Sequence, residues 1–191
     1  MTQTNDTKKI ISDLFHQHAD LLYNYAITRI NDSQQAEDLV QETFISALKN
    51  YENFKGESKA STWLIAILKN KIIDIYRKKV REFKQESLDT LAFTDNYFDE
   101  KGHWKKGSYP GPWKSDAIDE QDRDEFYKIL QKCLSRLKEI QRIAFVMKHL
   151  DDAETEEICK ELEITASNYW VLIHRAKLQL RDCLEKNWIN V

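Results

Sequence analysis

Glycine and proline are scarce in this chain, which has 4 glycines and 2 prolines in 191 residues. Three of the glycines and both prolines fall between residues 102 and 112, so most of the chain lacks the residues that interrupt regular elements. Elsewhere apolar residues recur at helical spacing, without the alternation of strands. The sequence therefore predicts a soluble, all-α protein, and the stretch rich in glycine and proline predicts a flexible linker between two small helical domains.

Long apolar runs are also missing, and cysteines are few. No run approaches the roughly 20 apolar residues that cross a bilayer, and the polar N-terminus has no signal-peptide core, so we expect no membrane insertion. The three cysteines, Cys133, Cys159 and Cys183, are odd in number and far apart. They predict neither a disulfide framework nor a zinc site, and they fit a reducing cytoplasm. Only Cys183, near Arg181 and Lys186, has the basic setting of a redox-sensitive thiol, and the sequence leaves that role open.

The charge distribution favours macromolecular partners over small substrates. No glycine-rich phosphate loop, metal-ligand cluster or nucleophile–base spacing occurs, so we expect no enzyme, no cofactor and no metal site. The net charge of −3 argues against a free-standing DNA binder, because phosphate neutralisation supplies most non-specific affinity. Residues 55–84 nevertheless contain nine basic and three acidic residues, and residues 85–126 contain eleven acidic and five basic residues. This asymmetry predicts a nucleic-acid face followed by a segment that does not touch phosphate.

The first domain is expected over residues 8–81. Its first helix, at residues 8–30, has an inner stripe that includes Ile10 and Phe15, and Ser33 is the expected N-cap of the second helix. One face of the second helix is apolar or small: Ala36, Leu39, Val40, Thr43, Phe44, Ala47 and Leu48. The opposite face carries Glu37, Asp38, Gln41 and Glu42. The pattern predicts a stripe that faces the core and a polar surface that is either solvated or available to a basic partner.

A short polar loop follows and leads into a third helix, expected over about residues 62–79. The buried stripe of this helix is Leu64, Leu68, Ile72 and Ile75. A different face carries Asn70, Asp74, Arg77 and Arg81, with Lys71, Lys78 and Lys79 beside it and Trp63 at the start. The third helix is therefore expected to present a polar, basic face that is separate from its buried stripe.

Residues 82–117 are the expected linker. As a flexible coil it would span roughly 33 Å on average, and several times that when extended. Two turns of duplex measure about 70 Å, so the linker could hold two modules that far apart. It also contains several aromatic residues: Phe93, Tyr97, Phe98, Trp104, Tyr109 and Trp113. These fit a lid packed on its own domain equally well, and the sequence does not separate the two interpretations.

The second domain is expected over residues 118–186 and has the pattern of a helix-turn-helix. Two amphipathic helices come first, with inner residues Phe126, Ile129, Leu130, Cys133, Leu134 and Leu137, then Ile140, Ile143, Ala144 and Met147. A short helix buries Ile158, Cys159 and Leu162, and Thr165 is placed to cap the long helix that follows. Glu163 stands in the turn, where a left-handed backbone would cost a non-glycine residue about 1 kcal/mol or more.

Four pieces of sequence, in the right order and spacing, resemble the second conserved domain of extracytoplasmic-function (ECF) sigma factors: Ala36–Phe44, Phe54–Gly56, Ser61–Leu64 and Asn70–Arg77. Residues 134–184 resemble the fourth domain of the same family. The chain departs from the family at Glu163, which is usually glycine, and at Trp170, which is often Lys or Arg. The second departure bears on the base contacts, because an indole cannot make a bidentate contact with guanine.

The resemblance implies a bacterial sigma factor that binds core RNA polymerase and directs promoter-specific transcription initiation through the −10 and −35 elements. The residues implied for the β′ clamp helices of polymerase are Glu37, Asp38, Gln41, Glu42 and Phe44. Those implied for the −10 element are Phe54, Lys55, Trp63, Asn70, Lys71, Asp74, Arg77 and Lys78. Those implied for the −35 element are Thr165, Ser167, Asn168, Trp170, Val171, His174, Arg175 and Lys177. The resemblance also implies contact with the polymerase β flap, an anti-sigma factor as a further partner, and a cytoplasmic protein without catalytic residues.

Two other functions stay open at this point. A conventional transcription regulator would bind an operator through the helix-turn-helix without polymerase. An anti-sigma-like adaptor would bind polymerase but not DNA, and the basic stripe over residues 70–81 argues against it.

Overall fold

The structure, a computed structural model, describes residues 2–86, 105 and 120–189. These residues form helices joined by turns, and no strand occurs within the described ranges, so the predicted all-α fold is confirmed. They fall into two compact units, Met1–Arg77 and Lys78–Val191, with the boundary inside one helix. Linker residues 87–104 and 106–117 lie outside the described residues, and both interpretations of the linker remain predictions.

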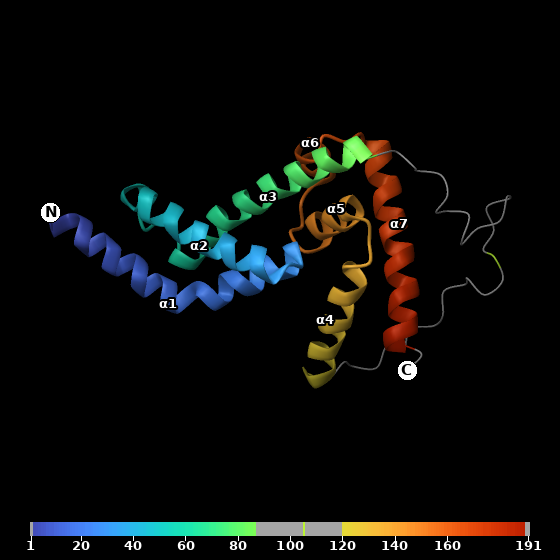
Figure 1. Ribbon diagram of the computed structural model, residues 1–191, viewed down its shortest axis with the longest axis horizontal. Helices are drawn as coiled ribbons and strands as arrows, with labels where there is room; N and C mark the ends of the chain where they lie inside the picture. Colours follow the sequence, from blue (N-terminus) through green and yellow to red (C-terminus); the bar gives the residue numbers. More distant parts are fainter. Residues whose placement is uncertain (1, 87–104, 106–119, 190–191) are drawn as a thin grey trace. The chain divides into compact units, whose positions relative to one another are not determined.

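Unit 1 begins with two long helices, α1 (Thr2–Ile30) and α2 (Ser33–Asn50), which pack against each other (Figure 1). Asn31 ends α1 with a left-handed backbone at φ 57°. Asp32 is the N-cap of α2, and its side chain accepts a hydrogen bond of 3.0 Å from the backbone N–H of Gln35. The expectation that Ser33 caps this helix was wrong by one residue. Asp32 has the extended backbone that an N-cap needs, and Ser33 is already helical.

The third long helix of the chain, α3 (Ala60–Glu86), follows the short 3₁₀ turn η1 (Tyr51–Asn53). Its stripe of Leu64, Leu68 and Ile72 is buried as predicted, but Ile75 is only half-buried and Tyr76 takes the next core position at 1% exposure. A period of four residues carries the stripe from Ile72 to Tyr76. The Tyr76 hydroxyl donates a hydrogen bond of 3.1 Å to the backbone carbonyl of Arg29, which ties α3 to α1.

Unit 2 contains α4 (Glu120–Leu134), α5 (Glu139–His149), α6 (Thr155–Glu161) and α7 (Ala166–Leu184), followed by the π-helical turn η3 (Glu185–Ile189). Both α4 and α5 pack on α7 (Figure 1). The predicted amphipathic helices are confirmed: Ile140, Ile143, Ala144 and Met147 are buried in α5, and Phe126, Ile129 and Leu130 of α4 pack against the core beside α7.

Two of the three cysteines are joined. Cys133, at the end of α4, and Cys183, at the end of α7, form a disulfide with a Cα–Cα distance of 5.8 Å across 50 positions of sequence. The expectation of unpaired cysteines was wrong, because the spacing along the chain does not show that the ends of α4 and α7 lie side by side. Cys159 is free. Burial, together with the nearby Glu156 carboxylate, raises the pKa of its thiol above the usual value.

Candidate nucleic-acid and polymerase interface

The outer face of α2 presents acidic and amide groups to solvent. Glu37, Asp38 and Gln41 are exposed, and so is Glu42. Phe44 lies beneath them at 6% exposure and meets Phe15 of α1 edge-on, with ring centroids 5.0 Å apart. The α2 residues predicted from the sequence are thus divided, with four on the surface and Phe44 in the core that supports it.

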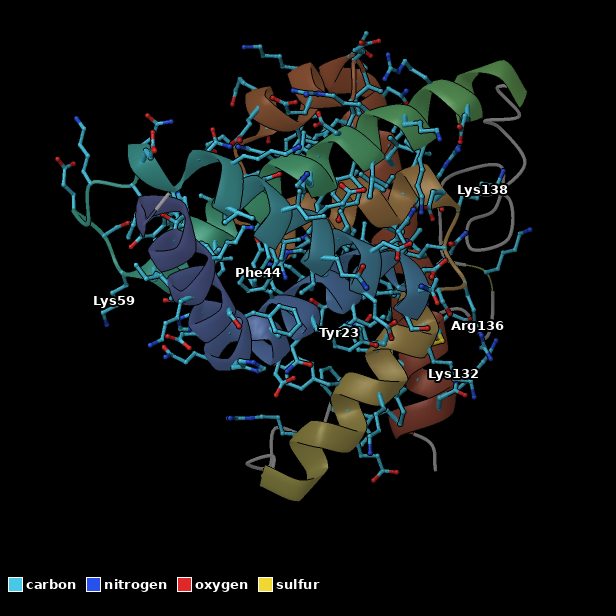
Figure 2. All side chains as sticks on the ribbon, turned by 60° about the vertical axis from the view of Figure 1, so that its left-hand side comes forward. Tyr23, Phe44, Lys59, Lys132, Arg136 and Lys138 are labelled. Carbon is cyan, nitrogen blue, oxygen red and sulfur yellow. A yellow bond between two sulfur atoms is a disulfide. The ribbon has the colours of Figure 1, made fainter. Side chains whose placement is uncertain are left out.

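A groove of about 220 Å³ runs between α1 and α2 beside this acidic face. Its lining residues are Phe15, Ala19, Asp20, Tyr23, Glu37, Val40 and Gln41. Figure 2 labels Tyr23, which lines this groove, and Phe44 of α2. Apolar spacing predicts Phe15 and Ile10 in the inner stripe of α1, but the side chain of Phe15 is 39% exposed at the groove and that of Ile10 is 38% exposed. The expectation that both face inward was wrong, because α2 covers only part of the apolar surface of α1.

Three aromatic rings come together where the loop over residues 54–59 joins α3. Phe54 and Trp63 are stacked, with centroids 4.5 Å apart and planes 21° apart, and Tyr51 lies 6.3 Å from each. Between them the loop residues from Lys55 to Lys59 are exposed, and Gly56 has a left-handed backbone at φ 72°. The stack fixes both ends of a short exposed loop, while the tip of the loop projects into solvent. Sequence reasoning did not single out Tyr51.

The predicted polar face of α3 is exposed. Asn70, Asp74, Arg77 and Lys78 all lie on the surface. The guanidinium of Arg77 donates a hydrogen bond of 2.9 Å to Asp74, and Lys78 lies 4.0 Å from Glu82. Exposed pairs of this kind contribute about 0–1 kcal/mol. The basic groups therefore remain available to an anionic partner at small cost.

Lys71 is placed differently from the other basic residues of α3. Its ammonium group lies 3.3 Å from the Glu42 carboxylate of α2, and its side chain is 24% exposed whereas that of Glu42 is 61% exposed. The structure thus joins a residue predicted to contact DNA with one predicted to contact polymerase.

The helix-turn-helix of unit 2 consists of α6, the turn over residues 162–165, and α7. Ile158 and Leu162 are buried, and Ile164 is half-buried in the turn. Glu163 has φ 51°, so the turn does need a left-handed residue at that position. The Thr165 side chain accepts a hydrogen bond of 3.2 Å from the backbone N–H of Asn168, and Thr165 is the N-cap of α7 as predicted.

The exposed face of α7 contains most of the residues predicted for duplex recognition: Ser167, Trp170, Val171, His174 and Lys177. Trp170 is 61% exposed and Val171 is 40% exposed, so this face is unusually apolar at its centre. Arg175 does not share the face, because it is 8% exposed and its Nε has no hydrogen-bond partner in the described structure. Asn168 is half-buried.

One further titratable group lies near this face. His149 ends α5, its ring is 4.5 Å from that of Phe145, and burial together with the positive charges of Lys177 and Lys148 lowers its pKa below the usual value. Its surroundings therefore disfavour the protonated, charged ring. Sequence reasoning missed it, because only the packing of α5 beside α7 brings it near Lys177.

Comparison with known proteins agrees with this arrangement. Residues 14–82 match the family described as Sigma-70 region 2, and residues 127–180 match Sigma-70, region 4. A Haemophilus influenzae protein named "Probable RNA polymerase sigma factor" is 41% identical over 178 residues, which is 93% of this chain and 91% of that protein. The ECF RNA polymerase sigma factor SigX of Bacillus subtilis is 27% identical and covers 94% of this chain and 84% of its own length.

The chain belongs to the ECF sigma factors of bacterial RNA polymerase. A sigma factor directs polymerase to promoters, and the two matched regions of this one fall on the two parts of the chain where the candidate surfaces lie. A solved complex of the sigma factor RpoE with the anti-sigma factor NepR from Bartonella quintana is 22% identical, covers 93% of this chain and 98% of its own, and has a TM-score of 0.43. In the described part of this sigma factor, no helix is both long and apolar enough to span a membrane.

Proposed function

We propose that this sigma factor docks on the β′ clamp helices of core polymerase through α2, opens the −10 element with the 54–59 loop and α3, and recognises the −35 element with α7. The observation that carries the proposal is the division of one small helical unit into two surfaces. An exposed acidic face lies on α2, whereas an aromatic and basic face extends from Phe54 to Arg77. The first suits a basic protein partner and the second suits single-stranded DNA.

At the −10 element the proposed mechanism is capture of unpaired bases. A base taken out of the duplex stacks on an aromatic ring, which is worth about 1–3 kcal/mol per base. Phe54 and Trp63 supply such a platform next to the exposed loop, and Arg77 and Lys78 lie along α3 at positions suited to the following phosphates. Asn70 adds a side chain able to donate to and accept from a base edge.

At the −35 element α7 would enter the major groove, as the second helix of a helix-turn-helix does. Ser167 and His174 carry polar groups that can meet base edges, and Lys177 can reach a phosphate. Trp170 and Val171 instead offer apolar surface, which fits the 5-methyl group of thymine and not the paired acceptors of guanine. Arg175 is buried and has no assigned contact in this scheme.

The sigma factor itself catalyses nothing in this proposal, and polymerase provides the active site. Unit 2 would additionally meet the polymerase β flap, and an anti-sigma factor would hold the protein inactive by covering one of the same faces. The place of action is the cytoplasm, where polymerase and the chromosome are found. The family resemblance supports these partners.

Run-off transcription with purified core polymerase tests the proposal. The test variant is Lys71→Gln/Arg77→Gln/Lys78→Gln, and the control Lys8→Gln/Lys9→Gln/Lys49→Gln removes the same charge from exposed positions on α1 and α2. We expect the test variant to bind core normally and to reduce promoter opening at least about tenfold, because it loses phosphate contacts, while the control stays active.

Intact promoter opening by the test variant would contradict the role of α3. Tight binding of the chain alone to a closed palindromic duplex, with no response to core polymerase, would instead indicate an operator-binding regulator.

A further inference from the structure

The disulfide between Cys133 and Cys183 encloses the whole helix-turn-helix. The two cysteines lie at the ends of α4 and α7, and α5, α6 and almost all of α7 lie between them in the sequence. A cross-link closes the chain into a loop and restricts the unfolded state of everything inside it. This bond therefore acts on the stability of the element that recognises DNA and leaves unit 1 untouched.

The two sulfur atoms have different surroundings. The Arg136 guanidinium lies 3.6 Å from the Cys183 sulfur, and the Asn187 side-chain amide lies 3.7 Å from it. Figure 2 shows Lys132 and Arg136 on the part of unit 2 that holds the sulfur atoms. Neither basic residue has a carboxylate partner within the described segments. Positive charge and hydrogen-bond donors favour a thiolate. When the bond is reduced, Cys183 is therefore the nucleophilic member of the pair.

Cys133 has an apolar setting. It is 1% exposed and lies in a buried cluster with Leu134, Leu137 and Leu180. The same cluster includes Ala176 and Leu184 and is extended by Phe126, Ile129 and Leu130. This packing also holds α4 on α7, so apolar contacts as well as the sulfur–sulfur bond join the two helices. Such contacts would keep the two sulfur atoms near each other when the bond opens.

We propose that Cys133 and Cys183 form a reversible dithiol–disulfide site, and that its oxidation by low-molecular-weight disulfides stabilises the DNA-recognising module. The link to transcription rests on the function proposed above. In the reducing cytoplasm disulfides are usually transient and catalytic or redox-sensing, and a pair placed at bonding distance beside a cation fits that class. Cys159 is not part of the site, because it is a free cysteine on α6, whereas Cys133 and Cys183 are bonded to each other.

The exchange proceeds in two steps that balance. The Cys183 thiolate attacks one sulfur of the small disulfide and displaces one small thiolate, which leaves a mixed disulfide on Cys183. The Cys133 thiol then loses its proton and attacks the Cys183 sulfur, which displaces the second small thiolate. Two protein thiols are thereby oxidised to one disulfide, and the small disulfide is reduced to two thiols. Excess thiol drives the same steps in reverse, with entry at Cys183, which at 8% exposure is the less buried of the two.

The site is tested by equilibrating the full chain in glutathione buffers that range from fully reduced to fully oxidised, followed by acid quench, alkylation and mass spectrometry. We expect Cys133 and Cys183 to be oxidised together in the same buffers. The oxidised fraction in each buffer should be the same whether the protein starts reduced or oxidised. A Cys159→Ser control should behave identically, and Cys133→Ser should stop at a mixed disulfide on Cys183. A pair that stays bonded in fully reduced glutathione, or never bonds in fully oxidised glutathione, would overturn the proposal.

Hydrogen exchange tests the effect on the module. A cross-link over a loop of this length is expected to lower the equilibrium constant for the unfolding of unit 2 by roughly 30-fold to 1000-fold. Oxidation should therefore slow exchange across α5, α6 and α7 and leave α1 and α2 unchanged. The double variants Cys133→Ser/Cys183→Ser and Cys133→Ala/Cys183→Ala should exchange like the reduced protein in every buffer. Equal exchange of the oxidised and reduced proteins would refute the stabilising role.

A transcription assay distinguishes failure of the redox proposal from failure of the proposed sigma-factor function. With core polymerase, output from a −35-dependent promoter should be higher for the oxidised than for the reduced protein, and the double variants should not respond to the buffer. Output that is present but independent of redox state would refute the link to transcription while the proposed function stands. Absence of output in every buffer would count against the proposed function, and the thiol titration would still decide the site.

Discussion

Glu163 is a residue held in a conformation that its side chain disfavours. It has φ 51° in the turn between α6 and α7, and an L-residue with a β-carbon pays about 1–2 kcal/mol for the left-handed region. The turn geometry of the helix-turn-helix, which buries Ile158 and Leu162 just before this residue, imposes this conformation. The sequence identified the position, and the structure shows that the strain is real.

Replacing this residue by glycine should stabilise unit 2. We compare Glu163→Gly with Glu163→Ala, because both remove the carboxylate and only glycine relieves the backbone. The glycine variant should be more stable than the alanine variant by about 1 kcal/mol, which corresponds to a melting temperature higher by roughly 4–8 °C in a domain of this size. Thermal denaturation followed by circular dichroism measures the difference. Equal melting temperatures would show that the surrounding structure has relaxed the strain.

Trp170 and Val171 give the recognition face its particular chemistry. They are 61% and 40% exposed, and large apolar side chains at the centre of an otherwise polar face are suited to a contact and not to solvent. A thymine methyl group is the only apolar feature that the major groove offers to them.

Uracil substitution tests that contact directly. Replacing −35 thymines by uracil one at a time removes a single methyl group, and at the contacted position transcription should fall roughly threefold to fivefold, as expected for one lost buried methyl. The variant Trp170→Ala should be less active on the thymine promoter and should no longer distinguish the two bases. Uracil placed outside the −35 element is the matched control. If the wild type tolerates uracil at each −35 thymine, the apolar contact does not exist.

Among the elements, α5 has two ion pairs at Glu139 in its first turn, one with Arg142 and one, at 2.8 Å, with Lys79 of α3. Arg142 is 3% exposed, and its guanidinium donates two hydrogen bonds to Glu139, at 2.8 Å and 3.2 Å. Burial raises the pKa of Glu139, but the hydrogen bonds and charges of Arg142 and Lys79 outweigh that effect and leave the pKa below its usual value. Because the folded-state pKa is depressed, the carboxylate contributes stability above the unfolded pKa, and that contribution is lost as the pH falls through the folded pKa.

The variant Glu139→Gln should reveal this pH dependence. At about pH 7 it should be less stable than the wild type, since Arg142 and Lys79 both lose the Glu139 carboxylate. The difference should shrink as the pH is lowered below about 4, because the wild-type carboxyl is then protonated as well. Urea denaturation of both proteins across that range measures the change. A constant difference at all pH values would show that the pair does not couple protonation to folding.

Most elements could be predicted from sequence, because each one is amphipathic with the period of a helix. The stripe of α3 and the two inner stripes of α4 and α5 follow directly from apolar spacing. The predictions of burial fail where the packing of a neighbouring helix determines which side chain is covered. Tyr76 takes the core position predicted for Ile75, because the buried stripe continues from Ile72 with a period of four, and its hydroxyl bonds to the Arg29 carbonyl. Phe15 is partly exposed because α2 leaves part of α1 uncovered.

At the scale of the whole molecule, two units with separate cores explain how one chain carries surfaces of different chemistry. The sequence predicts two domains on either side of a stretch rich in glycine and proline. That division stays a prediction, because the two units of the structure divide inside α3, between Arg77 and Lys78. The disulfide was not predictable, because its cysteines are 50 positions apart and meet only when α4 packs on the end of α7. The groove beside α2 was missed for the same reason, since Phe15 and Tyr23 join Val40 only through the packing of two helices.

Binding to core polymerase should depend on the acidic face of α2. The variant Glu37→Lys/Asp38→Lys reverses two exposed charges there, and Asp13→Lys/Glu52→Lys reverses two exposed charges elsewhere in unit 1. We expect the first variant to raise the Kd for core polymerase about tenfold or more, because like charges across an interface are strongly unfavourable, and the second to change it little. Fluorescence anisotropy with labelled protein measures both, and equal affinities would show that the clamp helices bind another face.

The ion pair between Lys71 of α3 and Glu42 of α2 links the two candidate surfaces of unit 1. One carboxylate cannot serve two cations at full strength, so a basic helix that settles on α2 competes with Lys71 for the same oxygen atoms. When a basic helix displaces Lys71 from Glu42, the lysine becomes an unpaired positive charge on the side of α3 suited to a phosphate. Binding of polymerase to α2 would thereby raise the affinity of α3 for DNA. Without polymerase, the ion pair would lower that affinity.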